Sequence, residues 1–331
     1  MTLAVEVSGL VKEYGGRGGV RALDGIDLQI PAGTVMCVLG PNGAGKTTTV
    51  RIIATLLKPT SGLVHVAGVD VLKDPMAARH KIGLSGQYAA VDENLTGFEN
   101  LRMVSRLYGM TKSQASARAR ELLSSFQLED AADRRSSTYS GGMRRRLDLA
   151  GALVARPRVV ILDEPTTGLD PRGRQDMWQV ISELVEDGTS VLLTTQYLEE
   201  ADFLADRITL IDKGRVIAQG SAEDLKSTIG GETMTIRMAP GQDMRTAHRV
   251  IAEMGVGEPV SDPLTTELSV IVTNGTRTMV EVLRRLDDAH IYVNDANVHK
   301  PSLDDVFLSL TGESVGSTEA APADRVQEAM L

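Results

Sequence analysis

Cysteine is nearly absent from this chain of 331 residues, which contains only Cys37. No disulfide can therefore form within the chain, and the apolar run around Cys37 indicates a buried small side chain rather than a redox group. Long apolar runs are absent too, since none approaches the roughly 18 residues that a membrane-spanning helix needs. The N-terminal segment 1–7 lacks a basic stretch and is more typical of a strand than of a signal peptide. These features predict a cytoplasmic chain whose membrane role, if any, depends on a separate subunit.

Positive charge is in deficit, with 35 Lys and Arg residues against 44 Asp and Glu residues and a formal net charge of −9. The phosphates of a nucleic acid would be repelled by such a surface, so we expect no nucleic-acid partner. Hydrophobic residues make up 42% and charged residues 24% of the chain, which is typical of a globular protein. The length leaves room for about two domains.

Strands and helices are predicted to alternate over the first part of the chain. Central parallel strands, buried on both faces, are predicted where short apolar runs occur, at 35–39, 159–162, 191–193 and 208–211. Shorter alternating segments predict an antiparallel side sheet at 5–10, 26–30 and 63–69. Helical patterns occur at 97–125 and 173–186.

A boundary is predicted at Gly230-Gly231, which gives domains 1–229 and 230–312. The second domain is predicted to have the order β-α-β-β-α-β, which suggests a small α+β, ferredoxin-like fold. Its predicted strands are 233–238, 256–260, 267–273 and 291–299, and its helices are 242–254, 276–289 and 302–310. The small, polar and acidic residues of 313–331 predict a disordered tail.

A phosphate-binding loop is the strongest local motif. The segment matches G-x-x-x-x-G-K-[ST] and continues into a helix, with the residues Gly40, Pro41, Asn42, Gly43, Ala44, Gly45, Lys46, Thr47 and Thr48. A strand precedes it, so backbone N–H groups and the helix start converge on phosphate, which disfavours a chance Gly-rich turn. Lys46 supplies positive charge and Thr47 offers a hydroxyl to Mg²⁺.

Two further segments carry polar groups suited to the same chemistry. Asp163 and Glu164 close the apolar run 159–162, and we expect this strand to lie beside the strand of the phosphate loop. Asp163 is then placed to hold Mg²⁺, and Glu164 to polarise an attacking water. Ser140, Gly141 and Gly142 open a predicted helix and form a second anion site.

In this order, these motifs resemble the ATP-binding subunits of ABC (ATP-binding cassette) transporters. The resemblance implies an α/β P-loop NTPase cassette, with a RecA-like parallel-sheet core, an antiparallel β subdomain and a helical subdomain. It implies ATP and Mg²⁺ as cofactors. It also implies that Gln87 reaches Mg²⁺ or water, that Tyr14 stacks on adenine, and that Asp170, at the end of the run 165–170, contacts a second cassette. Tyr14 could instead merely end a strand, because the Gly-rich segment 15–19 lengthens the loop that follows it.

In that family the Ser-Gly-Gly tip caps the ATP held by a partner cassette. Because this chain has one tip and one phosphate loop, the resemblance implies a homodimer or a paired cassette arranged head to tail. Two positions depart from the family pattern: residues 139–143 replace L-S-G-G-Q with Tyr-Ser-Gly-Gly-Met, and Gln196 replaces the switch histidine. An amide can still donate a hydrogen bond to the γ-phosphate, but it cannot carry the charge of an imidazolium.

Four segments together resemble the daunorubicin-resistance type of ATP-binding subunit: 86–89, 139–148, Gln196 and 302–312. This resemblance implies export of a hydrophobic drug or lipid through a separately encoded membrane permease, with the chain bound to the cytoplasmic face of the membrane. The second domain could serve assembly or bind a small regulator. A ribosome- or DNA-directed ABC ATPase commonly has two cassettes or coiled-coil inserts, and this sequence shows neither. A metabolite kinase or GTPase has no use for the Ser-Gly-Gly tip, and only the resemblance argues against an importer.

Overall fold

The computed structural model describes residues 2–15, 19–86, 90–262 and 265–311. The chain divides into two compact units, Met1–Ser221 and Ala222–Leu331. The division precedes the boundary expected at Gly230-Gly231, because helix α8 (Ala222–Ser227) packs against helix α11 (Leu303–Thr311) of the second unit. Within the described ranges, no helix is both long and apolar enough to cross a membrane. The segment 313–331, for which disorder was predicted, lies outside the described residues.

A six-stranded sheet forms the centre of the first unit, in the order β10-β9-β3-β8-β7-β6. All neighbours are parallel except β10, which is antiparallel to β9. The strands are β3 (Val35–Leu39), β6 (Ile82–Ser85), β7 (Val159–Asp163), β8 (Ser190–Thr195), β9 (Arg207–Asp212) and β10 (Arg215–Gly220). Every residue of β3, β7 and β8 is buried, which explains their continuous apolar runs.

β7 was expected to lie beside β3, and this prediction is wrong. β8 lies between the two strands and pairs with β3 at Leu192 and with β7 at Leu193. Strands of nearly equal length and apolarity do not reveal their order in a sheet. β6 and β10 were not predicted. β6 is only four residues long and contains Gly83, and β10 is mostly half-exposed, with a short apolar run at 216–218.

The antiparallel side sheet is confirmed, with the order β2-β1-β4-β5. Its strands are β1 (Leu3–Tyr14), β2 (Val20–Pro31), β4 (Ser61–Val66) and β5 (Val69–Asp70). The single strand expected over 63–69 is divided in two by a turn, because Ala67 and Gly68 both have positive φ, 46° and 78°. Buried residues of this sheet share one hydrophobic core with residues of β3 and β7.

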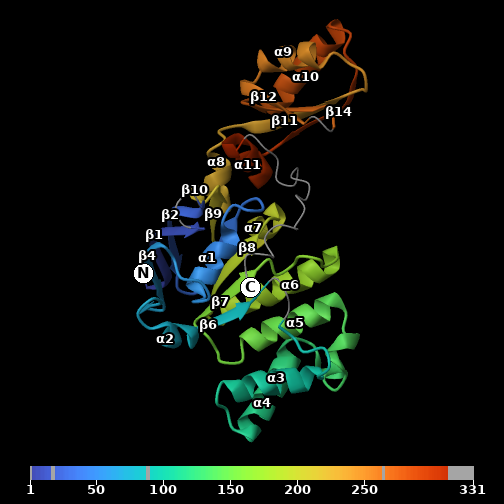
Figure 1. Ribbon diagram of the computed structural model, residues 1–331. Coiled ribbons are helices and arrows are strands. Elements are labelled where there is room, and N and C mark those ends of the chain that lie inside the picture. The colour runs from blue at the N-terminus through green and yellow to red at the C-terminus, as the bar shows by residue number, and fades with distance from the viewer. Residues whose placement is uncertain (1, 16–18, 87–89, 263–264, 312–331) are drawn as a thin grey trace. The chain divides into compact units, whose positions relative to one another are not determined.

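Seven α-helices complete the first unit in the described part of the chain. They are α1 (Lys46–Ile53), α2 (Pro75–Arg79), α3 (Gly97–Leu107), α4 (Lys112–Ser125), α5 (Gly141–Ala152), α6 (Pro171–Glu186) and α7 (Leu198–Leu204). Capping boxes at Thr96 and Thr111 fix the starts of α3 and α4. Figure 1 shows α3 and α4 packed together, with α5 between them and the sheet.

The second unit has the predicted β-α-β-β-α-β order. Its elements are β11 (Glu232–Met238), α9 (Met244–Ala252), β12 (Val256–Asp262), β13 (Glu267–Val272), α10 (Gly275–Asp288) and β14 (Val293–His299). The sheet order is β12-β13-β11-β14 with all neighbours antiparallel, which is the ferredoxin-like arrangement. Both helices pack on the sheet (Figure 1), over a core that includes Ile236, Ile251 and Leu286.

Candidate functional site

The glycine-rich turn after β3 leads directly into the first residue of α1. Gly45 stands at the N-cap with φ 111°, and no described side chain caps the helix. The backbone N–H groups of the first turn are therefore available to an anion. Glycine is required on steric grounds as well: a Cβ at Gly40 would lie 2.1 Å from the carbonyl oxygen of Ile211, and one at Gly45 would lie 2.6 Å from Leu23 Cδ2.

The Lys46 side chain folds back over this turn and is only 5% exposed. Its Nζ donates hydrogen bonds to the carbonyl oxygens of Gly40 (2.7 Å) and Pro41 (3.0 Å). Glu164 Oε1 is 4.0 Å away. Burial lowers the pKa of the Lys46 ammonium, while the carboxylates of Glu164 and Asp163 act in the opposite direction. The result is a buried cation, next to free amides, that a bound polyphosphate would neutralise.

Asp163 is held at the other side of the turn by two hydroxyl groups. Its Oδ1 accepts a hydrogen bond from Thr194 Oγ1 (2.6 Å) and a longer one from Thr47 Oγ1 (3.4 Å). Thr194 comes from β8, the strand that separates β7 from β3. Carboxylate and hydroxyl oxygens are hard ligands that suit Mg²⁺, which usually keeps waters and phosphate oxygens in its shell. In the described ranges no three His, Cys, Asp or Glu residues form a metal cluster, so Thr47 and Asp163 could hold Mg²⁺ only together with such outside ligands.

Glu164 occupies a strained turn. Its φ is 50°, which is uncommon for a residue with a Cβ and costs about 1–3 kcal/mol. The backbone N–H of Glu164 donates to the carbonyl and to the hydroxyl oxygen of Thr194, both at 3.1 Å. Thr167 Oγ1 donates to its Oε2 at 3.3 Å. The turn thus holds the carboxylate near Lys46, at 12% exposure of its side chain.

Arg145 is a central residue that the sequence analysis did not select. It lies on α5, is 7% exposed, and donates to four backbone carbonyls. These carbonyls belong to Gly86 (2.5 Å), Asp163 (3.2 Å), Glu164 (3.1 Å) and Pro165 (2.8 Å). Burial lowers the pKa of Arg145, and the nearby Asp148 opposes this effect. Helical spacing was the available signal, since Arg145 shares a face with the buried Leu149 and Ala152.

The predicted second anion site lies at the starts of α5 and α6. Ser140 caps α5 by accepting from the N–H of Met143 at 3.2 Å, and Asp170 caps α6 by accepting from the N–H of Gly173 at 2.9 Å. The two helix starts line one cavity of about 380 Å³, which includes Gly141, Gly142 and Gly168. None of residues 40–48 is among its lining residues. The phosphate turn and this cavity are therefore separate sites within one chain.

The remaining predicted residues are placed around these groups. Gln196 is half-buried and follows β8 directly, two residues after Thr194. Tyr14 ends β1, is 39% exposed, and has the ammonium of Lys12 5.1 Å from its ring centroid. Asn42 and Gly43 are exposed at the tip of the turn, Ala44 is buried, and Thr48 is half-buried in α1. Gln87 lies outside the described residues.

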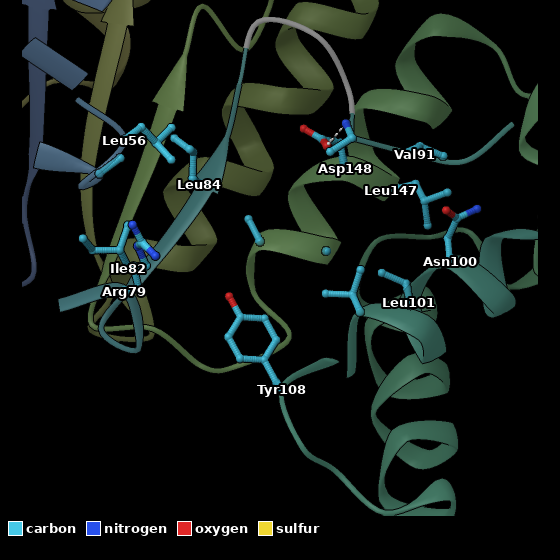
Figure 2. A pocket seen from close by; sticks show the side chains of 15 residues that line it. Leu56, Arg79, Ile82, Leu84, Val91, Asn100, Leu101, Tyr108, Leu147 and Asp148 are labelled. Carbon is cyan, nitrogen blue, oxygen red and sulfur yellow. Dashed lines mark hydrogen bonds between the residues drawn. The ribbon is translucent and has the colours of Figure 1, made fainter. Parts of the chain in front are cut away.

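A second cavity, of about 310 Å³, lies between the sheet and the helices α3 and α5. Figure 2 shows Leu56, Ile82 and Leu84 on one side of it and Leu101, Leu147 and Tyr108 on the other. Asp148 borders the cavity and accepts from Ser85 Oγ (2.5 Å) and the N–H of Ala90 (2.7 Å). Burial raises the pKa of the Asp148 carboxyl. Leu56 and Tyr108 stay 62% and 45% exposed, so the groove has an open apolar mouth.

Two stretches of the chain match known families. Residues 23–167 match the family described as ABC transporter. Residues 220–311 match the family described as ATP-binding protein DrrA1-3-like, C-terminal domain. The two matches cover the nucleotide-site segment and the second compact unit.

Full-length relatives are similar to nearly the whole chain. The daunorubicin resistance ATP-binding protein DrrA2 of Streptomyces coeruleorubidus is 49% identical over 97% of this chain and 98% of its own length. The doxorubicin resistance ATP-binding protein DrrA of Mycobacterium tuberculosis is 45% identical, over 95% of this chain and 96% of its own. The linearmycin resistance ATP-binding protein LnrL of Bacillus subtilis is 33% identical, over 94% and 99% respectively.

Solved structures with the same fold cover about two thirds of the chain. A dimeric, post-hydrolysis form of the ATP-binding cassette MJ0796 bound to ADP and Pi superposes with a TM-score of 0.60 at 29% identity, over 66% of this chain and 98% of that one. The cbiO1 subunit of an ABC transporter from Clostridium perfringens gives a TM-score of 0.63 at 27% identity, over 70% and 94%.

The buried guanidinium of Arg145 gives a direct test of this arrangement. The substitution Arg145→Met removes its four hydrogen bonds to backbone carbonyls from the interior. We expect the free energy of unfolding to fall by about 3 kcal/mol, measured by urea denaturation. The matched control is Arg144→Met, because Arg144 pairs with the exposed Glu93 at 3.0 Å and should change stability by less than about 1 kcal/mol. Equal losses for the two variants would contradict the role assigned to Arg145.

Proposed function

This chain belongs to the family of ABC transporter ATP-binding proteins, and we propose that it is the ATP-hydrolysing subunit of an exporter for a hydrophobic drug or lipid. In this proposal, ATP and Mg²⁺ bind between two cassettes arranged head to tail. Hydrolysis drives transport through a separately encoded membrane permease, with the chain on the cytoplasmic face of the membrane. The two copies form a homodimer or a pair with a related cassette.

The observation that carries the proposal is the separation of the two anion sites. Lys46 and the start of α1 belong to the phosphate turn, and none of residues 40–48 lines the cavity that contains Ser140 and Asp170. In this proposal, one chain supplies the phosphate turn of one nucleotide site and the Ser-Gly-Gly segment of another. Head-to-tail pairing places the α5 start of one chain against the phosphates held by the other, so that both helix dipoles act on one triphosphate. The related cassette MJ0796 is dimeric with ADP and Pi bound, which supports the pairing of two cassettes.

Each residue near the phosphate turn then has a distinct role. Lys46 and the amides of α1 bind the β- and γ-phosphates, while Thr47 and Asp163, with Gln87, hold the Mg²⁺ shell. Mg²⁺ neutralises charge that develops on the phosphate oxygens. Glu164 orients and polarises the attacking water, and Gln196 donates an amide hydrogen bond to the γ-phosphate. Tyr14 stacks on the adenine ring.

Export of apolar compounds is favoured by the relatives. Their names refer to resistance to daunorubicin, doxorubicin and linearmycin, and two further relatives, 34% and 35% identical, are named Nod factor export ATP-binding protein I. All of these names are consistent with an outward direction of transport. The substrate contacts themselves belong to the permease in this proposal.

The groove of Figure 2 is the surface that we assign to the permease. Its mouth exposes Leu56 and Tyr108, and its walls come from two layers, the sheet and the helical subdomain. Ala90 lines it three residues after Gln87. A permease segment seated there would touch both layers and the chain next to the proposed Mg²⁺ ligand, which couples its position to the nucleotide.

The dimer can be trapped by slowing hydrolysis. In Glu164→Gln the amide cannot accept a proton from water, so ATP should persist between two chains and hold them together. We expect a dimer in size-exclusion chromatography with ATP, Mg²⁺ and the permease present, and no dimer without ATP. The matched control adds Gly142→Asp, whose Cβ meets no described atom within 4 Å but whose charge repels phosphate. A cassette that stays monomeric as Glu164→Gln with ATP contradicts the proposal.

The switch position can be tested by kinetics. Removal of one donor to developing charge typically lowers turnover about 100-fold, so we expect this loss in kcat for Gln196→Ala with little change in KM for ATP. Gln196→His should hydrolyse ATP with a new pH dependence near pH 6.5, because imidazole titrates there and an amide does not. Unchanged turnover in Gln196→Ala would show that Gln196 does not contact the γ-phosphate.

A further inference from the structure

Two side-chain contacts join helices α6 and α7. The guanidinium carbon of Arg174 lies 4.9 Å from the ring centroid of Tyr197, and Trp178 Nε1 donates to Glu200 Oε1 at 3.1 Å. Arg174 and Trp178 are one turn apart on α6, and Tyr197 and Glu200 are three residues apart at the start of α7. Both pairs therefore face each other along one helix–helix seam.

The seam lies between Gln196 and Asp170, which act together in the proposed mechanism. Tyr197 directly follows Gln196 and stands at the N-cap of α7. Arg174 Nε donates, at 3.4 Å, to the carbonyl of Leu169, which directly precedes Asp170. Arg174 thus contacts Tyr197, which follows the proposed γ-phosphate donor Gln196. It also contacts Leu169, which precedes Asp170 at the proposed dimer contact.

The seam also contains an aromatic contact between Trp178 and Phe203, which holds the C-terminal part of α7. The rings of Trp178 and Phe203 are stacked, with centroids 5.1 Å apart and an interplanar angle of 26°, although Phe203 is 63% exposed. Offset stacking of this kind contributes about 0.5–1.5 kcal/mol beyond the area that it buries. Phe203 is therefore held by a specific partner rather than by general burial.

Burial of the Glu200 carboxyl group in this seam is energetically unfavourable. It is 1% exposed, its Oε2 has no hydrogen-bond partner in the described chain, and the same is true of Thr166 Oγ1. Burial raises the pKa of Glu200, and the hydrogen bond from the Trp178 indole opposes this effect. A buried carboxylate with an unfilled oxygen does not maximise stability, and such groups often mark a functional constraint.

We propose that Arg174, Tyr197, Trp178 and Glu200 form a positioning clamp, which holds α7 against α6 so that Gln196 and the Asp170 loop move as one body. The inference rests on the proposed function. A neutral amide contributes to the transition state only through a well-aligned hydrogen bond, so the residue that follows it must be fixed. The clamp residues do not touch the nucleotide; they act through Gln196.

The test measures whether Arg174 acts through Gln196. In the otherwise wild-type chain, Arg174→Met should lower kcat for ATP about 10-fold and leave KM within about twofold, because nucleotide binding does not involve the clamp. In a Gln196→Ala background, the same change should alter kcat by less than about twofold, since no positioned amide remains. Gln179→Met is the matched control, because Gln179 lies on α6 and contacts only Glu183 of the same helix in the described interactions.

Two further variants keep the test decisive if Arg174→Met folds poorly. Tyr197→Leu removes the same contact from the other side and should reproduce both the loss in kcat and its dependence on Gln196. Tyr197→Phe keeps the aromatic face and should retain wild-type kcat, because the contact uses the ring rather than the hydroxyl. Thermal unfolding of each variant reports any purely structural effect.

The outcomes separate the clamp from the proposed function. Equal losses from Arg174→Met in the wild-type and Gln196→Ala backgrounds would overturn the clamp alone, because Arg174 would then act without Gln196. Full turnover in Arg174→Met and Tyr197→Leu, with Gln196→Ala impaired, would also overturn only the clamp. Full turnover in Gln196→Ala would overturn both the γ-phosphate contact and the clamp built on it.

Discussion

A buried ammonium beside an uncapped helix start is the constraint on which the rest of the first unit depends. Lys46 is 5% exposed, and its direct hydrogen-bond partners in the described chain are two neutral carbonyls. Burying a cation is unfavourable unless opposite charge lies close by. Asp163 and Glu164 supply that charge from the end of β7, and Glu164 Oε1 lies 4.0 Å from the ammonium. The amides at the uncapped start of α1 stay available to an anion.

The strained turn at Glu164 follows from the same constraint. A carboxylate in direct contact with Lys46 would satisfy the cation and compete with phosphate. The positive φ of Glu164 and its hydrogen bonds to Thr194 and Thr167 hold the carboxylate close, but not in full contact. Arg145 of α5 donates hydrogen bonds to the carbonyls of the same turn and so helps to hold its strained conformation. The start of α5 is also the predicted second anion site. Arg145 thus links the Glu164 turn to the predicted second anion site within one chain.

The parts of this site that are local in sequence could be predicted, and the parts set by strand order could not. The phosphate turn between β3 and α1 and the β-α-β-β-α-β order of the second unit follow from consecutive patterns, and both are present. The neighbour of β3 is β8 rather than β7, because buried parallel strands of similar composition carry no mark of their order. Thr194 was missed for this reason. Arg145 was not selected as a site residue, although helical spacing places it with Leu149 on the buried face of α5.

In the proposed function, Gln196 takes the place of a switch histidine, so its contact with the γ-phosphate depends on geometry rather than on charge. The attraction between an imidazolium and a phosphate falls slowly with distance, so a charged switch residue tolerates displacement. The hydrogen bond of an amide weakens steeply once its angle falls toward 120°, so a neutral switch residue tolerates very little. The segment around Gln196 is correspondingly well held: Thr194 is bonded to Asp163, Tyr197 lies under Arg174, and Glu200 is bonded to Trp178. These contacts join β7, α6 and α7, so the position of Gln196 depends on the same elements that carry Asp163 and Asp170. In the proposed function, such a cassette would respond to its partner through the position of a neutral donor, without a change in the charge of the site.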